Sequence, residues 1–347
     1  MQENENIAVT PNKKLSAWLA ARTREAYKPH YRHMNKRRRM IYKELLYALV
    51  MLEKQAVIPL RSDAGEINDV ISKLFEDNAV IFYAEVNSFS VKDSSTVLHI
   101  RYNYPTEQIE YIAGVINTSL ERLKEKCKGA SLLEKEIIVH NLLVKSVVYD
   151  LDEQLPIYKS HAAFLYQRAV CSGISRSACL MFGYLGIDAY RVRGDALPKK
   201  DDGSSHHAWN MVRCGNAFYH LDITFDNGLT KGSDYFTYDY FNLTDEQARR
   251  SRIWYDDYIV SGKERVDYYT LKGLRFSDSE RLRTYIRLNS AFRGKPIRFA
   301  AEGAVAALSA QATVSLIRQA LQDGGWRGSF SYSHSEKNNT WCVFLGG

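Results

Sequence analysis

The sequence predicts an α+β protein in which helices pack on antiparallel sheets, and three observations lead to this fold class. Apolar residues recur at helical spacing in several segments of the first 190 residues. Runs rich in aromatic and β-branched residues come in adjacent pairs with short polar turns between them, which is typical of hairpins. The composition, 45% hydrophobic and 25% charged, is that of a globular protein, and 347 residues suffice for about two domains.

The N-terminal third is predicted to begin with helices and to continue with a hairpin. From Leu15 to about Val57 the apolar residues follow helical spacing, and Pro29 should divide this segment into two helices. The elements expected next are a helix over 65–76, strands over 80–88 and 96–104 with a turn at 92–95, and a helix from 105 to about 128.

The middle and the C-terminal end continue this alternation. Ser131 and Glu134 have the form of a capping box, so a helix is expected to begin there. The elements expected after it are a helix over 174–185, paired strands over 206–212 and 218–224, and a last unit from about residue 274 with a strand at 297–300, a helix at 304–321 and strands at 330–334 and 340–345.

The positive charge belongs to one end of the chain. Residues 1–40 carry ten Lys or Arg and three acidic residues, which accounts for the whole net charge of +7. Such a segment could contact nucleic acid or an anionic surface. The favoured interpretation is a solvated helix that carries the basic run at 36–39, so a nucleic-acid partner is the lesser expectation.

Neither a membrane span nor a secretory signal is predicted. No window approaches 18 consecutive apolar residues, and residues 1–14 are polar. The sequence as it stands is therefore expected to remain in the cytoplasm.

The five cysteines, an odd number, are widely spaced. They form no C-x-x-C pair and no zinc-ligand spacing, so neither a disulfide framework nor a metal site is predicted, and no cofactor is expected. At least one thiol should be free, and such a thiol is a candidate nucleophile.

Cys171 is the best placed of these thiols. The residues that follow it form an amphipathic helix that ends before Gly186, so Cys171 should lie at a helix N-terminus. Unpaired backbone N–H groups and the helix dipole lower a thiol pKa there, and the same groups can hold an oxyanion. A buried structural cysteine is the alternative interpretation.

A hairpin supplies the groups that such a thiol needs. With a two-residue loop at Cys214-Gly215, His207 would stand directly opposite Asp222, and directly opposed Cβ atoms lie about 5 Å apart. The carboxylate could then fix the imidazole tautomer, as in nucleophile–base–orienter sites. This pairing depends on the assumed loop length.

Three stretches stand out together in the segment from about Ser131 to Asp226. They are Val170-Cys171-Ser172-Gly173, His207-Ala208-Trp209-Asn210 and Leu221-Asp222-Ile223-Thr224-Phe225-Asp226, and the helix before the cysteine ends Val147-Val148-Tyr149-Asp150. With these motifs the segment resembles the transglutaminase-like superfamily, the microbial homologues of transglutaminases and cysteine proteases. The resemblance implies a papain-like core in which Cys171 is the nucleophile, His207 the base and Asp222 the orienting acid, and Asp226 matches a frequent second acid outside the triad.

Several positions depart from the family pattern. Ala169 stands where glycine is common, Phe225 where tryptophan is common, and Ser172 where cross-linking animal transglutaminases have tryptophan. The sequence also shows no acidic calcium loop. These departures argue against a dedicated protein cross-linker.

Other residues near these motifs are assigned structural roles. Gln167 is expected to serve a loop or cap rather than an oxyanion, Trp209 to pack the core, and His140 to be structural. The polar loop 199–205 is expected either to border the cleft or to be an inert surface loop.

The expected domains are a basic helical arm at 1–40, an α/β companion module at 41–128, a catalytic domain at 129–273 and a small α/β unit at 274–347. The companion module is expected because residues 77–83 resemble the N-terminal module that accompanies the catalytic domain in this family. The expected function is hydrolysis of an amide bond in a peptide or protein through an acyl-thioester on Cys171. Acyl transfer to an amine, deamidation by the same triad, and a non-catalytic binding module are the alternatives.

Overall fold

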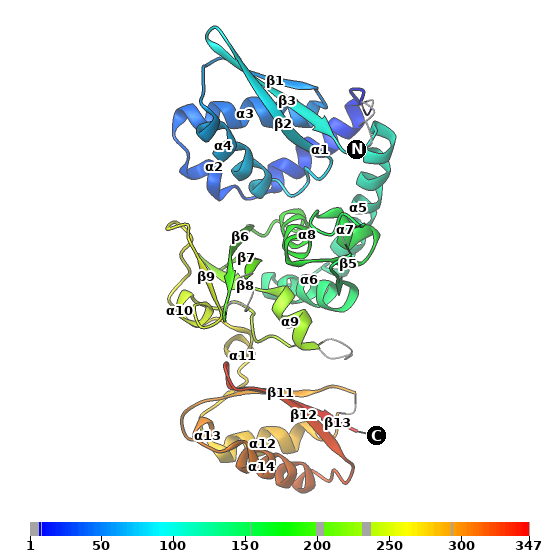
Figure 1. The fold of residues 1–347 in the computed structure, drawn as a ribbon. Coiled ribbons are helices and arrows are strands. Elements are labelled where there is room, and N and C mark those ends of the chain that lie inside the picture. The colour runs from blue at the N-terminus through cyan, green and yellow to red at the C-terminus, as the bar shows by residue number, and fades with distance from the viewer. Residues whose placement is uncertain are drawn as a thin grey trace.

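A computed structural model describes residues 7, 9–152, 154–198, 205–230, 237–292 and 294–346. Figure 1 shows three tiers stacked along the long axis of the molecule, and each tier combines helices with an antiparallel or mixed sheet. The α+β fold class is confirmed.

The N-terminal tier holds a three-stranded antiparallel sheet in the order β1-β3-β2, covered by helices. The predicted break at Pro29 is confirmed, because α2 begins there. The helical pattern predicted to continue to about Val57 ends earlier, and the chain there forms β1. The strand predicted over 80–88 begins at Ala84 instead. The bounds are α1 Lys13–Glu25, α2 Pro29–His33, α3 Lys36–Met51, β1 Gln55–Ile58, α4 Ala64–Asp77, β2 Ala84–Lys92 and β3 Ser95–Tyr102.

The segment predicted as a basic arm is folded into this tier. Leu19 of α1 is fully buried in the same core as Ile41 of α3. Several of its arginines are engaged in ion pairs: Arg22 with Glu25, Arg37 with Glu66 and Arg38 with Asp69. The division expected at residue 40 falls inside α3.

The middle tier carries helices and the four-stranded sheet β8-β7-β6-β9. The predicted capping box is present, with the Ser131 side chain accepting from the Glu134 N–H and the Glu134 side chain accepting from the Ser131 N–H. The bounds are α5 Thr106–Lys126, α6 Leu132–Ser146, β4 Val148–Tyr149, α7 His161–Leu165, β5 Arg168–Ala169, α8 Cys171–Tyr184, β6 Ala189–Ala196, β7 His206–Cys214, β8 Ala217–Leu221, α9 Ile223–Thr230, α10 Asp245–Ala248, β9 Arg252–Trp254 and α11 Tyr268–Leu271.

The C-terminal tier is a four-stranded sheet in the order β10-β11-β13-β12 with helices α12, α13 and α14 on it. Its buried residues form a hydrophobic cluster of their own, centred on Phe299, Ile317 and Trp341. The bounds are β10 Arg275–Phe276, α12 Ser279–Asn289, β11 Ile297–Ala301, α13 Gly303–Ala306, α14 Ala310–Asp323, β12 Phe330–Ser335 and β13 Thr340–Leu345.

The core of the middle tier lies on both faces of its sheet. One face joins the main core together with α5, α6 and α8, and Val212 and Leu221 belong to it. The other face forms a separate cluster around Trp209, Met211 and Trp254. Among the described helices, none has both the length and the apolar character needed to cross a bilayer.

Candidate active site

Cys171 is the first residue of α8, as the sequence predicts. The preceding residue, Val170, is extended and offers no side-chain cap to the first turn of the helix. The first backbone N–H groups of a helix have no partner within the helix, so an uncapped N-terminus leaves donors for an anion. Gly173 allows the chain to pass close by, since a Cβ there would lie 2.3 Å from the Ile157 carbonyl oxygen.

The hairpin that carries His207 has a different register from the predicted one. Cys214 pairs with Ala217 and Asn210 with Leu221, so the turn is Gly215-Asn216 rather than Cys214-Gly215. Gly215 has a φ of +60°, which suits the first central position of a tight hairpin turn. The direct opposition of His207 and Asp222 is therefore wrong, because the pairing is shifted by two residues.

The two side chains meet nevertheless. A shift of two residues keeps each side chain on its face, whereas a shift of one would reverse it. Asp222 follows the end of β8 and caps α9: its Oδ1 accepts from the Phe225 N–H at 3.0 Å. Its other oxygen, Oδ2, lies 2.7 Å from His207 Nε2, and both residues are buried.

The thiol completes the arrangement. Cys171 forms a hydrogen bond with His207 and accepts another from the backbone N–H of Ala208. Because Nε2 of the imidazole lies at Asp222, Nδ1 is the nitrogen that faces the sulfur. The structure thus brings together all three residues that the sequence singled out.

The electrostatics of these three groups favour a charged pair. Burial raises the pKa of the Cys171 thiol, but the hydrogen bond and the charge of His207 outweigh it, so the pKa is lowered. Burial lowers the pKa of His207, but Asp222 outweighs it and the pKa is raised. Burial likewise raises the pKa of Asp222, but His207 and Arg252 hold it below its usual range. Thiolate and imidazolium are therefore stabilised together.

Arg252 is a buried cation that the sequence analysis missed. Its side chain is 0% exposed, and its Nη1 is ion-paired with Oδ2 of Asp222. The guanidinium lies 4.7 Å from the Phe225 ring centroid and 4.9 Å from that of Tyr240. Gly194 lets β9 approach β6, since a Cβ there would lie 1.9 Å from the Ile253 carbonyl oxygen. Arg252 is thereby held beside Asp222.

Aromatic rings fix the imidazole on both sides. The Phe225 ring is stacked on His207 at 4.4 Å between centroids, and Trp209 is stacked on it at 5.8 Å. Trp209 is buried, and its indole N–H donates to Nδ1 of His220 at 2.9 Å. Nε2 of His220 lies 2.8 Å from Asp245, so a second His–Asp pair anchors the ring that flanks His207.

Tyr149 is a second residue that the motifs did not single out for chemistry. Its hydroxyl is in hydrogen-bond contact with Cys171, and its side chain is 42% exposed. Burial and the neighbouring Cys171 raise the pKa of Tyr149 to about 12, so the phenol keeps its proton. It is therefore a donor beside the sulfur.

The other residues discussed from the sequence lie outside the contact chain of Cys171. His140 is fully buried, with its Nε2 2.9 Å from Asp226 Oδ2. Gln167 is exposed with a φ of +53°, and its carbonyl accepts from the Val148 N–H at 2.8 Å. Most of the polar loop, residues 199–204, lies outside the described residues.

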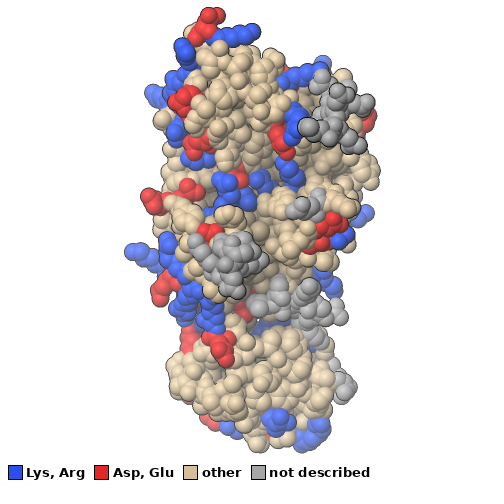
Figure 2. All heavy atoms as spheres, viewed as in Figure 1, with Lys and Arg blue, Asp and Glu red and all other residues tan. Residues whose placement is uncertain are grey.

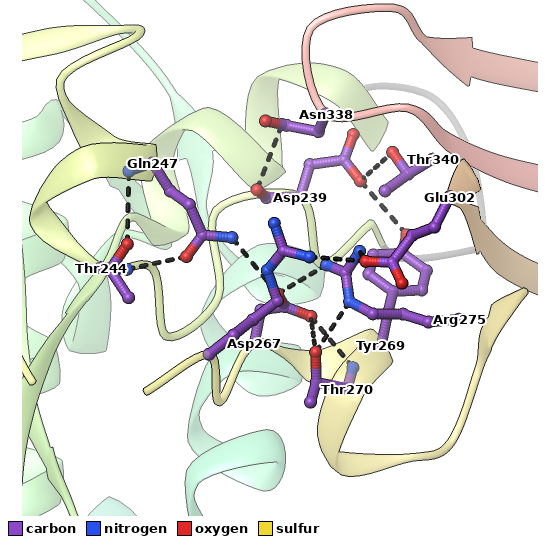
Figure 3. A network of polar contacts seen from close by, with 11 residues as sticks. Asp239, Thr244, Gln247, Asp267, Tyr269, Thr270, Arg275, Glu302, Asn338 and Thr340 are labelled. Atoms are coloured by element: carbon purple, nitrogen blue, oxygen red, sulfur yellow. Dashed lines mark hydrogen bonds and ion pairs between the residues drawn. The ribbon is translucent and has the colours of Figure 1, made fainter. Parts of the chain in front are cut away.

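The segment that carries Tyr240 is tied to the C-terminal tier. The backbone carbonyl of Tyr240 accepts from the Asp222 N–H at 2.9 Å. Its neighbour Asp239 accepts from the Thr340 hydroxyl at 2.6 Å and from the Tyr269 hydroxyl at 3.2 Å (Figure 3). Beside them Arg275 binds Asp267 and Glu302 in the same network (Figure 3). The C-terminal tier thus contacts the loop that binds the backbone of Asp222.

Nothing in the described part of the chain groups three His, Cys, Asp or Glu side chains as metal ligands. The groups that the site does present are a thiol, an imidazole and backbone N–H donors, which are the parts used in nucleophilic catalysis by cysteine.

Comparison with known proteins supports the same segment. The model of the Transglutaminase-like superfamily matches residues 120–223, which include Cys171, His207 and Asp222. The resemblance drawn from the sequence motifs is confirmed over this segment. No curated protein matches the chain at a significant level.

Two solved structures are similar over part of the chain. One is described as a TGase: it is 16% identical, with a TM-score of 0.31, over 52% of this chain and 52% of that chain. The other is a candidate cysteine protease from Cytophaga hutchinsonii: it is 12% identical, with a TM-score of 0.28, over 41% of this chain and 61% of that chain. In both cases the match covers less than two thirds of the neighbour's own length.

Proposed function

We propose that this protein is a cysteine-dependent enzyme that cleaves amide bonds in peptides or proteins through an acyl-thioester on Cys171. The observation that carries the proposal is the contact chain from the Cys171 sulfur to His207 and on to Asp222, with 2.7 Å between His207 Nε2 and Asp222 Oδ2. A thiol in an ordinary structural role needs none of these partners.

The proposed reaction has two halves. The Cys171 thiolate attacks the amide carbon, and the resulting oxyanion is held by N–H groups at the start of α8. His207 gives its proton to the leaving amine, so the C–N bond breaks and the thioester remains. His207 then takes a proton from water, the hydroxide attacks the thioester, and the acid is released with the thiol restored.

The surrounding residues supply orientation. Asp222 holds the imidazole with Nδ1 toward the sulfur, and Arg252 keeps that carboxylate ionised. Phe225 and Trp209 restrict rotation of the ring. An amine in place of water would turn the second half into acyl transfer with the same groups.

A peptide screen with mass-spectrometric readout tests this function. The wild type, Cys171→Ser and Cys214→Ser are incubated with a peptide library, with and without methylamine. Burial raises the pKa of Cys214 to about 11, so its replacement is a matched control for loss of a thiol. We expect cleavage in the wild type and in Cys214→Ser, and none in Cys171→Ser.

The products also separate the alternatives. Cleaved peptides support hydrolysis of backbone amides, and a side-chain mass gain corresponding to methylamine incorporation supports acyl transfer. If the wild type and Cys171→Ser give the same products, amide chemistry at Cys171 is excluded and a binding module becomes the better account.

A further inference from the structure

Three arginines surround a single carboxylate on one side of Cys171. Arg191 and Arg193 of β6 and Arg176 of α8 all reach Glu76, the penultimate residue of α4. Arg176 Nη2 lies 3.1 Å and Arg193 Nε lies 3.7 Å from Glu76 Oε1, and Arg191 Nη1 is paired with Oε2. We call Arg176, Arg191 and Arg193 the arginine cluster.

The charges of the arginine cluster are not balanced. Glu76 is 9% exposed, and although burial raises its pKa, the three arginines lower it to about 2, so it carries one negative charge. Among the described residues, no other carboxylate forms an ion pair with these arginines. The nearby Asp69 is paired with Lys73 and Arg38 instead. Three cations therefore face one anion.

Arg191 also has an unused donor. Its side chain is 7% exposed, and its Nε is buried without a hydrogen-bond partner. A buried donor of a charged group left without an acceptor is costly, and such groups call for an explanation. The arginine cluster therefore keeps positive charge and donor capacity that Glu76 and Ser172 do not use.

The arginine cluster borders the nucleophile. Nη2 of Arg191 donates to the hydroxyl of Ser172, the residue after Cys171, at 3.2 Å. Arg193 is the direct β-sheet partner of Ala208, whose N–H binds the Cys171 sulfur. The Arg193 side chain is 58% exposed, so it is the open end of the cluster. A ligand at Arg193 would therefore lie beside the thiol.

The surface shows the same concentration of charge. Figure 2 shows Lys and Arg atoms gathered at the level where the N-terminal tier meets the middle tier, with few acidic atoms among them. At this level α4 packs against β6, and Arg176 of α8 reaches the C-terminal end of α4, where its Nη1 donates to the Phe75 carbonyl at 2.6 Å.

We propose that the arginine cluster is an anion subsite that binds a carboxylate of the substrate next to the bond attacked by Cys171. The proposal rests on the proposed function and names its substrate class: peptides with an acidic side chain, or with a free terminal carboxylate, beside the reacting amide. Arg193 makes the contact, and the charge of the buried Arg191 and Arg176 reinforces it.

The first test compares two alkylating reagents of similar size. Iodoacetate carries a carboxylate and iodoacetamide does not, and both react with the thiolate, so the ratio of their rates at Cys171 is independent of the thiol pKa. We expect Arg193→Gln to lower the ratio of the iodoacetate rate to the iodoacetamide rate about two- to five-fold, as the loss of one screened charge near the reagent carboxylate allows. Arg193→Lys should keep most of it.

A matched control removes the same charge elsewhere. Arg213 lies six residues beyond His207 on β7, which is about 20 Å along the strand, and its side chain is 37% exposed. Arg213→Gln should leave the ratio unchanged. If Arg193→Gln changes the ratio no more than Arg213→Gln does, the anion subsite is overturned.

The second test locates the carboxylate. Protection of Cys171 from iodoacetamide is measured with N-acetylglutamate amide, N-acetylglutamine and N-acetylglutamine amide. The first has only a side-chain carboxylate, the second only a terminal one, and the third has none. Stronger protection by the first identifies an acidic side chain as the ligand, and stronger protection by the second a chain terminus. Equal protection by all three contradicts the proposal.

These results separate the two claims. If Cys171 is no more reactive than Cys127, Cys179, Cys214 and Cys342 toward either reagent, the proposed function fails. If Cys171 is selectively reactive but the ratio of its iodoacetate and iodoacetamide rates is the same in the wild type and in Arg193→Gln, the function stands and only the anion subsite fails.

Discussion

Arg252 and His207 bind the same atom, Oδ2 of Asp222. His207 Nε2 lies 2.7 Å from this oxygen, and Arg252 Nη1 is ion-paired with it. Asp222 is fully buried, so its charge depends on these two cations. Asp222 therefore forms a three-residue unit with His207 and Arg252 rather than a pair with His207 alone.

Replacement of Arg252 tests this unit. Arg252→Met leaves Asp222 with one cation, so we expect the free energy of unfolding at neutral pH to fall by about 3–5 kcal/mol. Arg252→Lys should recover part of it. Urea denaturation of the two variants measures the difference. Equal loss in both would mean that the guanidinium contributes by its shape and not by its charge.

The pH dependence of the unfolding free energy also tests the contact between Arg252 and Asp222. The pKa of Asp222 is lowered in the folded protein, so its stabilisation is present above the ordinary aspartate pKa of about 4 and is lost as the pH falls toward 2. In Arg252→Met that pKa should rise, which removes part of the acid-sensitive stabilisation. Unfolding measured between pH 2 and 7 checks the sign, and identical slopes for wild type and variant would contradict it.

Tyr149 is expected to stabilise the thiolate from the solvent side. Its hydroxyl contacts Cys171, so Tyr149→Phe removes a donor to the sulfur and should move the alkylation profile of Cys171 to higher pH. Tyr158→Phe is the matched control, since Tyr158 is a similarly exposed tyrosine and its backbone carbonyl, not its hydroxyl, binds Ser172. A profile that moves equally in both variants would exclude a direct role for the Tyr149 hydroxyl.

His220 should affect stability rather than the reactivity of the thiol. His220→Phe leaves the buried indole N–H of Trp209 without its acceptor, which should cost about 1–3 kcal/mol of unfolding free energy. The pKa of His220 is lowered, because burial outweighs the effect of Asp245. The stabilisation that neutral His220 gives the folded protein is therefore complete above the ordinary histidine pKa of about 6.5, and it is lost as the pH falls below that value. Thermal unfolding between pH 5 and 8 measures this, and a loss that grows at high pH would reverse the assignment.

The position of Cys171 was predictable because its signal is local. A cysteine followed by an amphipathic segment defines a helix start, and α8 begins at Cys171. The capping box at Ser131 and the helix break at Pro29 were predictable for the same reason, since both depend on residues within one turn.

The register of the hairpin formed by β7 and β8 was less predictable, because it depends on which two residues form the turn. Gly215 was placed at the second loop position, but it occupies the first, and this shifts the pairing by two residues. The prediction of a His207–Asp222 contact survived because a shift of two preserves the face and because the Asp222 side chain leaves the strand to cap α9.

Neighbouring residues in the sequence do not indicate the contact of Arg252 with Asp222 or the true start of the strand predicted over 80–88. Arg252 lies 81 positions after Cys171 on a three-residue strand, and only the tertiary fold shows that its charge meets Asp222. The strand predicted over 80–88 does not include 80–83, which instead form a buried turn in which the Ile81 N–H binds the Asn78 carbonyl. Tertiary burial there overrides the strand pattern.

The pH dependence of Cys171 alkylation in the wild type, His207→Ala and Asp222→Asn tests the central claim most directly. The lowered pKa of the thiol and the raised pKa of His207, about 9, predict a thiolate that persists well below the ordinary cysteine pKa of about 8.5 in the wild type. This thiolate should be lost in His207→Ala and diminished in Asp222→Asn. A wild-type profile with an ordinary thiol pKa, unchanged in both variants, would show that Cys171, His207 and Asp222 do not act together.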